Sequence, residues 1–197
     1  MVKLKTLENI NLTGQFLIAM PAMLDPHFSK TITYICTHNQ DGAMGVIVNR
    51  ATDITLTDLF EQIKLDSSSS SLLEKTVHFG GPVQPERGFI LHTPLVEYNS
   101  TLLVNNTIAL TTSKDILEAA AENNGPEKML VALGYAGWTP GQLEAEMLNN
   151  SWLSLDTNNL HDIHALIFDA PSHEKFNLAM QLMGLNLANL SDVAGHA

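Results

Sequence analysis

The chain has 197 residues, 45% of them hydrophobic and 6% aromatic, and its 10 Lys and Arg against 21 Asp and Glu give a formal charge of -11. A chain of this length buries enough surface for one core, so we expect a single domain over residues 1–197 that needs no metal or disulfide. The acidic balance and the scattered cations count against generic nucleic-acid binding, which needs clustered Lys and Arg to neutralise phosphates.

The cysteine content and the N-terminal residues bear on the compartment. Cys36 is the one cysteine of the chain and has no intramolecular partner, which is typical of a reducing environment. Residues 1–11 include Lys3, Lys5 and Glu8 without an apolar run, and no stretch approaches the ~20 apolar residues of a membrane span. We therefore expect a cytoplasmic protein without a membrane segment.

Two strands and a hairpin are predicted at the start of the chain. Apolar residues favour a buried strand over 12–20, which ends at Pro21. Residues 31–38 are rich in β-branched and aromatic types and predict a second strand. Asp41-Gly42 favours a tight turn, so 43–49 is expected to return beside 31–38 as a hairpin.

The next segment predicts a helix, a flexible connection and two strands. Thr55 is a candidate N-cap for a helix over 56–64. The serine run 67–71 predicts a flexible surface connection inside the domain. The two strands cover 76–79 and 87–93.

Strand and helix patterns alternate through the second half. The predicted strands are 107–111, 129–135 and 164–168. The predicted helices run from a Ser113 cap to about 123, from a Thr139, Pro140 and Gln142 capping box to about 149, and from 171 to about 183. The tail beyond about 187 is expected to fray. Hairpins mixed with single helices predict an α+β domain with a partly antiparallel sheet.

Distinctive blocks, many of them glycine-rich, follow one another along the chain. They are residues 14–19, 25–28, 36–39, 42–45, 49–50, 80–89, 92, 134–138, 140–144 and 152–153. In this order they resemble the YqgE/AlgH family of bacterial proteins, from Leu12 to about Gly184. Two departures are visible: Phe176 stands where Trp is common, and the serine run is a local variation.

The resemblance implies a compact α+β domain built on a strongly curved sheet. It implies little about activity, because the family is usually described as uncharacterised. One branch is labelled a regulator of transcription in alginate production, and no established catalytic residues carry over.

Gly80-Gly81-Pro82, with Arg87, His78 and His92 nearby, is the first candidate site. Backbone amides freed by paired glycines and a fixed guanidinium suit an anionic ligand. The alternative is a tight strand connection in which a glycine takes positive φ and Arg87 holds a carboxylate.

The segment from Gly137 to Gly141 is the second candidate. It sets a helix N-terminus beside the indole of Trp138, an arrangement suited to phosphate or carboxylate. The alternative is a capped helix with Trp138 in the core.

Cys36 and His38 suggest a nucleophile and a base, since alternate residues of a strand share a face. Their backbones would then lie roughly 7 Å apart, which makes a direct hydrogen bond awkward. The alternative is a buried, unreactive thiol.

The sequence offers little support for a metal site or for a catalytic pair of carboxylates. His161 and His164 lack a complete ligand set, so we expect no metal and no cofactor. Glu144 and Glu146 point to different sides of their helix, so a solvated face is expected rather than an acid and base pair.

These observations favour a non-enzymatic cytoplasmic binding or regulatory module that acts through a protein partner or a small anionic ligand, without direct DNA contact. The alternative is a cryptic enzyme or redox or ligand sensor for a small anionic molecule. In that version Arg50 and Arg87 clamp the charge, His38 or His92 is the acid or base, and Cys36 is a reactive thiol. The oligomeric state stays open.

Overall fold

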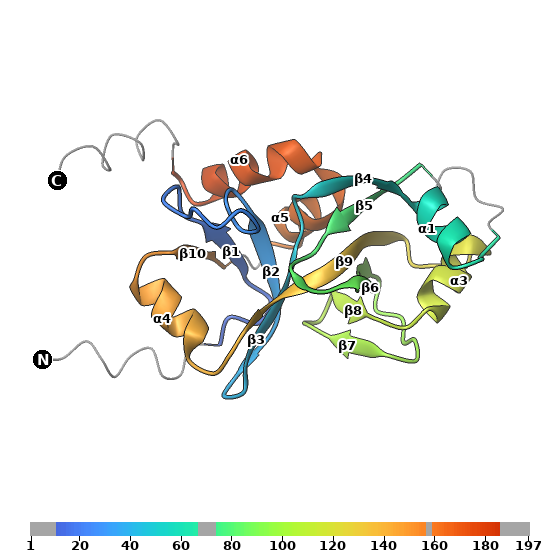
Figure 1. Ribbon diagram of the computed structural model, residues 1–197, viewed down its shortest axis with the longest axis horizontal. Helices are drawn as coiled ribbons and strands as arrows, with labels where there is room; N and C mark the ends of the chain where they lie inside the picture. Colours follow the sequence, from blue (N-terminus) through green and yellow to red (C-terminus); the bar gives the residue numbers. More distant parts are fainter. Residues whose placement is uncertain (1–10, 67–73, 157–158, 186–197) are drawn as a thin grey trace, which may run out of the picture.

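A long curved sheet with helices against it forms the fold (Figure 1), seen in a computed structural model that describes residues 11–66, 74–156 and 159–185. The strands are β1 (Phe16–Ala19), β2 (Ile32–Asn39), β3 (Gly42–Ile47), β4 (Ala51–Thr55), β5 (Thr76–Phe79), β6 (Val83–Thr93), β7 (Thr101–Leu103), β8 (Ala109–Thr111), β9 (Lys128–Trp138) and β10 (Trp152–Leu155). The helices are α1 (Leu56–Gln62), α3 (Asp115–Ala121), α4 (Gln142–Leu148), α5 (Leu160–His164), the π-helical turn η1 (Ala165–Asp169) and α6 (Ser172–Leu182).

Strand β9 joins the two parts of the sheet. The order is β10-β1-β2-β3-β9-β6-β8-β7, and a β4–β5 pair attaches to β9 through β5. The β5–β9 pair is parallel, and the other pairs are antiparallel. The predicted α+β class, with a single curved and partly antiparallel sheet, is confirmed.

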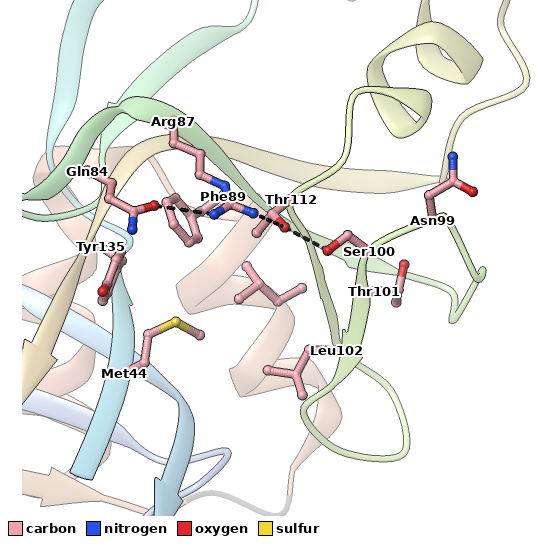
Figure 2. Close-up of a pocket in the computed structure, with 11 residues that line it drawn as sticks. Met44, Gln84, Arg87, Phe89, Asn99, Ser100, Thr101, Leu102, Thr112 and Tyr135 are labelled. Atoms are coloured by element: carbon pink, nitrogen blue, oxygen red, sulfur yellow. Dashed lines mark hydrogen bonds between the residues drawn. The ribbon is translucent and has the colours of Figure 1, made fainter. Parts of the chain in front are cut away.

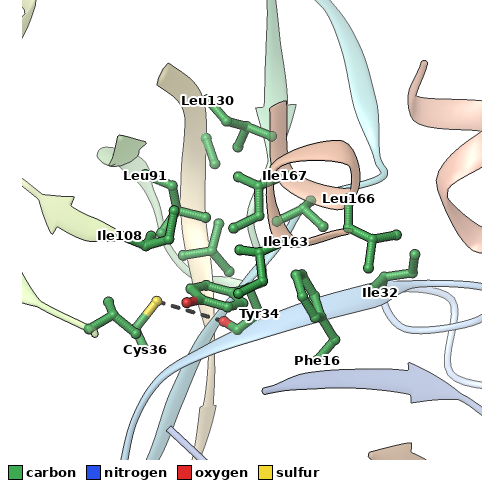
Figure 3. Packing of buried hydrophobic residues seen from close by; sticks show 14 of the residues in the cluster. Phe16, Ile32, Tyr34, Cys36, Leu91, Ile108, Leu130, Ile163, Leu166 and Ile167 are labelled. Atoms are coloured by element: carbon green, nitrogen blue, oxygen red, sulfur yellow. Dashed lines mark hydrogen bonds between the residues drawn. The ribbon is translucent and has the colours of Figure 1, made fainter. Parts of the chain in front are cut away.

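Three apolar clusters fill the spaces between the sheet and its helices. In the first, Phe16, Ile32 and Tyr34 of the sheet pack against Ile163, Leu166 and Ile167 of α5 and η1 (Figure 3). The second lies between α1, α3 and strands β5, β6 and β9, and the third lies between α4 and the opposite face of β1 to β3. Alternate residues of β9 enter different clusters, as expected for a strand with period two.

Local sequence signals account for several elements. Thr55 caps α1 as predicted, and Asp58 closes a capping box with it. The β2–β3 hairpin turns at residues 40 and 41, also as predicted. The predicted cap at Ser113 is wrong, because Ser113 Oγ donates to Asp115 Oδ1 and α3 begins after Lys114.

One predicted strand is wrong. Residues 164–168 belong to the end of α5 and to η1, not to a strand. The side chain of Asn159 accepts the His161 N–H and caps α5, and the buried residues Ile163, Leu166 and Ile167 follow helical spacing. A short apolar run fits either structure, so its period alone could not decide.

Two expectations from the sequence concern segments that the structure does not describe. The serine run 67–71 and the tail beyond 187 lie outside the described residues, so both expectations stay untested. Within the described residues, no helix has the length and apolar character needed to cross a bilayer.

Candidate anion-binding site

A bulge in β6 positions Arg87. Val83 pairs with Tyr135 and Gly88 pairs with Leu133, so four residues of β6 face one residue of β9, Gly134. Gly134 has a φ of +73°, and a Cβ there would lie 2.2 Å from the carbonyl oxygen of Gly81. The close crossing of the two strands therefore requires glycine and turns residues 84–87 out of the ladder.

A cavity of about 390 Å³ lies beside this bulge (Figure 2). Polar side chains of Gln84, Arg87, Thr112 and Ser100 follow one side of it, and Met44 and Leu102 lie opposite. The full lining is Met44, Gln84, Arg87, Phe89, Asn99, Ser100, Thr101, Leu102, Leu110, Thr112 and Tyr135. The cavity therefore offers a polar half and an apolar half.

The Arg87 guanidinium is held by neutral groups. Nη2 donates to Thr112 Oγ1 at 3.0 Å, Nη1 donates to Gln84 Oε1 at 3.3 Å, and Cζ lies 5.7 Å from the centre of the Phe89 ring. Thr112 Oγ1 also shares a hydrogen bond of 3.0 Å with Ser100 Oγ. The lining contains no Asp or Glu, and no ion pair of Arg87 occurs within the described parts of the chain.

Gly80 and Gly81 adjoin the bulge but serve the strand crossing. The Gly80 N–H donates to Leu133 O at 2.7 Å, and its carbonyl accepts from Ile47 N at 2.9 Å. A Cβ on Gly81, whose φ is +151°, would lie 2.1 Å from the carbonyl carbon of Tyr135. These contacts correspond to the tight-connection alternative, and the Gly80 amide is not available to an anion.

Arg50 does not join Arg87 at the cavity. Its Nη1 donates to the carbonyls of Pro26 and His27 at 2.8 and 2.9 Å, and its Nη2 donates to Ser29 at 3.2 Å. The guanidinium thus stabilises the loop between β1 and β2 and has a structural role.

His92 is also a structural residue here. It is fully buried, with Nε2 2.9 Å from Thr111 Oγ1, and desolvation lowers its pKa.

Cys36 and His38 lie on opposite sides of the sheet. A bulge in β2 between Ile35 and Thr37 shifts the alternation of side chains between the two faces of the sheet. The prediction that His38 and Cys36 share one face is therefore wrong. Cys36 lies in the first cluster, where burial raises the pKa of its thiol, and Sγ donates to Tyr34 O at 3.7 Å (Figure 3). The predicted pair of nucleophile and base is therefore not formed.

His38 has other partners. Its Nδ1 accepts the Leu12 N–H at 3.1 Å, which leaves the proton on Nε2 to donate to Glu144 Oε1 at 3.0 Å. This contact connects β2 to α4, and the expectation that Glu144 is merely solvated is wrong.

Trp138 takes the core position that the sequence left as an alternative. Its Nε1 donates to Glu146 Oε2 at 2.9 Å, and Trp152 Nε1 donates to the same oxygen at 2.8 Å. Glu146 is therefore a partly buried acceptor shared by two indoles of the third cluster, not part of a solvated face. No sequence signal indicated this shared acceptor, because the two indoles come from separate strands, β9 and β10.

Gly141 forms the start of α4. It takes a φ of +77°, and α4 begins at Gln142, so Thr139 is not the N-cap. Half of the predicted capping box is present, since Gln142 Oε1 accepts the Thr139 N–H at 3.0 Å. With seven residues, α4 is too short to supply a strong N-terminal dipole.

The site thus contains one predicted residue, Arg87, with partners that sequence reasoning missed. Thr112, Ser100, Met44 and Tyr135 come from other strands or their connections, and only the pairing of the strands brings them to Arg87. No group of three or more His, Cys, Asp or Glu suited to a metal occurs among the described residues.

Comparison with known proteins places this chain in a family. A family model described as AlgH-like matches residues 16–188. A UPF0301 protein of Thiobacillus denitrificans is 54% identical over 191 residues, which cover 97% of this chain and 100% of that protein. A UPF0301 protein of Nitrosospira multiformis is 47% identical with the same coverage. The chain therefore belongs to the AlgH-like family, and the resemblance seen in the sequence is confirmed.

Solved structures agree with the fold. The solution structure of the AlgH protein from Pseudomonas aeruginosa has 44% identity and a TM-score of 0.77, over 95% of this chain and 96% of that one. A crystal structure from Corynebacterium diphtheriae has 18% identity and a TM-score of 0.66, over 96% and 94% of the two chains, and it bears on the fold alone.

Proposed function

We propose that this protein is a non-enzymatic cytoplasmic binding module with a regulatory role, and that its ligand is a small amphiphilic anion held in the Arg87 cavity. The ligand's carboxylate or phosphate contacts Arg87, Thr112 and Ser100. Its apolar body covers Met44 and Leu102.

The observation that carries this proposal is the guanidinium without a carboxylate partner at a half-polar, half-apolar cavity. The planar guanidinium of Arg87 is held by Gln84, Thr112 and the Phe89 ring. These groups are neutral, so they leave its positive charge uncompensated. A guanidinium fixed in this way is suited to bidentate hydrogen bonding with two oxygens of a carboxylate or phosphate.

The thiol and histidine positions support binding rather than catalysis. Cys36 is buried with a raised pKa, and His38 and His92 use their ring nitrogens within the fold. The Pseudomonas aeruginosa relative is named AlgH, the name that the family shares, and we extend to this chain the regulator label of one branch of that family.

The test is a titration with a panel of short aliphatic and aromatic carboxylates and phosphate monoesters, followed by calorimetry and by ligand-observed NMR. We expect at least one compound with an apolar group to bind with a Kd of about 100 μM or tighter, a typical affinity for a few good contacts. Arg87→Gln is expected to weaken it at least tenfold, and Arg87→Lys less so, since Lys keeps the charge without the fork.

Lys64→Gln is the matched control, because it removes the same charge from a residue that does not line the cavity. An equal loss in Lys64→Gln and Arg87→Gln, or no binding across the panel, would overturn the proposed ligand class. The NMR spectra also follow the ligand over hours, and its chemical conversion would contradict the non-enzymatic role.

A further inference from the structure

A second cavity, of about 260 Å³, lies between β5, the start of β9 and the first turn of α6. It shares no lining residue with the Arg87 cavity. Its charged lining residues are the cations Lys75 and Lys175, beside the imidazole of His78 and the hydroxyls of Thr76 and Ser172. The lining contains no Asp or Glu, although the chain as a whole carries a net charge of -11.

Lys175 is a buried cation whose ammonium forms no ion pair with a carboxylate among the described residues. The residue is 2% exposed, and Nζ donates to the carbonyls of Val48 at 3.0 Å and Ile167 at 2.7 Å. Asp169, the acid that acts on it electrostatically, binds Lys128 Nζ at 2.7 and 2.8 Å instead. Desolvation lowers the pKa of Lys175 to about 8, so most of the ammonium stays charged at neutral pH.

Ser172 and His78 meet at the same cavity. Ser172 Oγ lies 2.9 Å from His78 Nε2. This distance alone would suit a nucleophile and its general base. Burial and then the Lys175 charge lower the pKa of His78 to about 4, however, so the imidazole accepts a proton poorly. The electrostatics disfavour proton abstraction and favour the arrival of negative charge.

We propose that this second cavity binds a small oxyanion, a carboxylate or phosphate group, which supplies the counter-charge that Lys175 lacks. Lys75 at the exposed side attracts the anion, and the Ser172 hydroxyl donates to it. Three separate features converge on this assignment: a cavity whose charged lining residues are both cations, a buried ammonium bonded to neutral carbonyls, and a hydroxyl at the cavity wall.

Anion binding here has a measurable electrostatic consequence. A negative charge beside His78 favours its protonated form, so the pKa of His78 rises when the site is occupied. The site also stabilises the folded state in proportion to its occupancy, since the unfolded chain does not assemble it.

The experiment follows the His78 ring by NMR as a function of pH, with inorganic phosphate, with acetate, and with chloride at matched ionic strength. We expect phosphate or acetate to raise the pKa of His78 by at least about one unit relative to chloride, with saturation below about 50 mM. Preference for one of the two identifies the group as phosphate or carboxylate.

Variants localise the effect. Ser172→Ala and Lys75→Gln are each expected to raise the apparent Kd at least about fivefold, as for a lost hydrogen bond or charge. His173→Gln is the matched control, because His173 is the next residue of α6 and its side chain is 82% exposed. Lys175→Met removes the central charge, and the other two variants keep the test valid if that variant does not fold.

Two results would overturn the second site: an anion effect no larger than that of chloride, or equal affinities for Ser172→Ala and His173→Gln. Arg87→Gln is expected to leave the His78 titration unchanged. Failure of the second site is therefore distinguishable from failure of the Arg87 cavity.

Discussion

The Cys36 thiol lies inside the first apolar cluster, 1% exposed, with a pKa raised by burial. The thiolate is the nucleophile that attacks a disulfide reagent, so the native chain reacts only when this region opens. We expect native protein to react with a chromogenic disulfide at least about 1,000-fold more slowly than protein unfolded in urea. Because the chain has one cysteine, the released chromophore counts this residue alone.

Native labelling within tenfold of the unfolded rate would contradict this burial. It would also restore the alternative of a redox sensor in which Cys36 is a reactive thiol. The Cys36→Ser variant gives the background rate of the assay.

The sequence identified which residues have suitable chemistry for a site, but it did not show which groups contact them. Arg87 was a candidate because it stands in a glycine-rich block, and it does line a cavity. Arg50 was a candidate on the same ground, but its guanidinium holds three carbonyls of one loop. The sequence signal was equivalent for both, and only the neighbours supplied by the fold separate them.

At the scale of elements, the crossing of β6 and β9 depends on glycine. A Cβ on Gly81 would meet backbone atoms of Tyr135 and Ala136 at 2.1 to 2.3 Å, whereas a Cβ on Gly141 would meet nothing within 4 Å. Both residues have positive φ, +151° for Gly81 and +77° for Gly141, so an alanine is strained at either position, but only at Gly81 does its Cβ also meet backbone atoms. We expect Gly81→Ala to lower the free energy of unfolding by about 3 kcal/mol or more.

Gly141→Ala is the matched control, with an expected loss of about 1 kcal/mol from its left-handed backbone. Urea unfolding followed by circular dichroism measures both. Similar losses in the two variants would show that backbone strain, rather than the strand crossing, sets the cost at Gly81.

Elements with strong local signals could be predicted, and edge elements could not. The β2–β3 hairpin and the capped helix α1 carry their own turn and cap residues. Strands β7 and β10 have three and four residues and lie at the ends of the sheet, so their sequences hold too few positions for a period. The bulges in β2 and β6 were also missed, and these decide which face His38 and Arg87 occupy.

At the scale of the whole molecule, the cations are dispersed and many are engaged. Lys175 is buried, Arg50 binds carbonyls, and Lys114 and Lys128 form ion pairs with Glu118 and Asp169. Phosphate neutralisation needs several free cations on one surface. We therefore predict no specific submicromolar DNA binding in gel-shift series at low and moderate salt.

A scrambled duplex of equal length is the control for non-specific binding, which weakens steeply as salt increases. A complex that prefers one sequence at submicromolar concentration and persists at moderate salt would contradict this prediction. Regulation through direct DNA contact would then replace regulation through a ligand or protein partner.

Strand β9 pairs with β3, β5 and β6 and contributes residues to all three apolar clusters. Neither part of the sheet therefore has a complete interior without it. A fluctuation that detaches β9 exposes every cluster at once, so opening near one cavity is energetically linked to opening near the other. Chain fragments cut on either side of β9 would each lack part of their core, so we expect the regions around the two cavities to unfold as one cooperative unit.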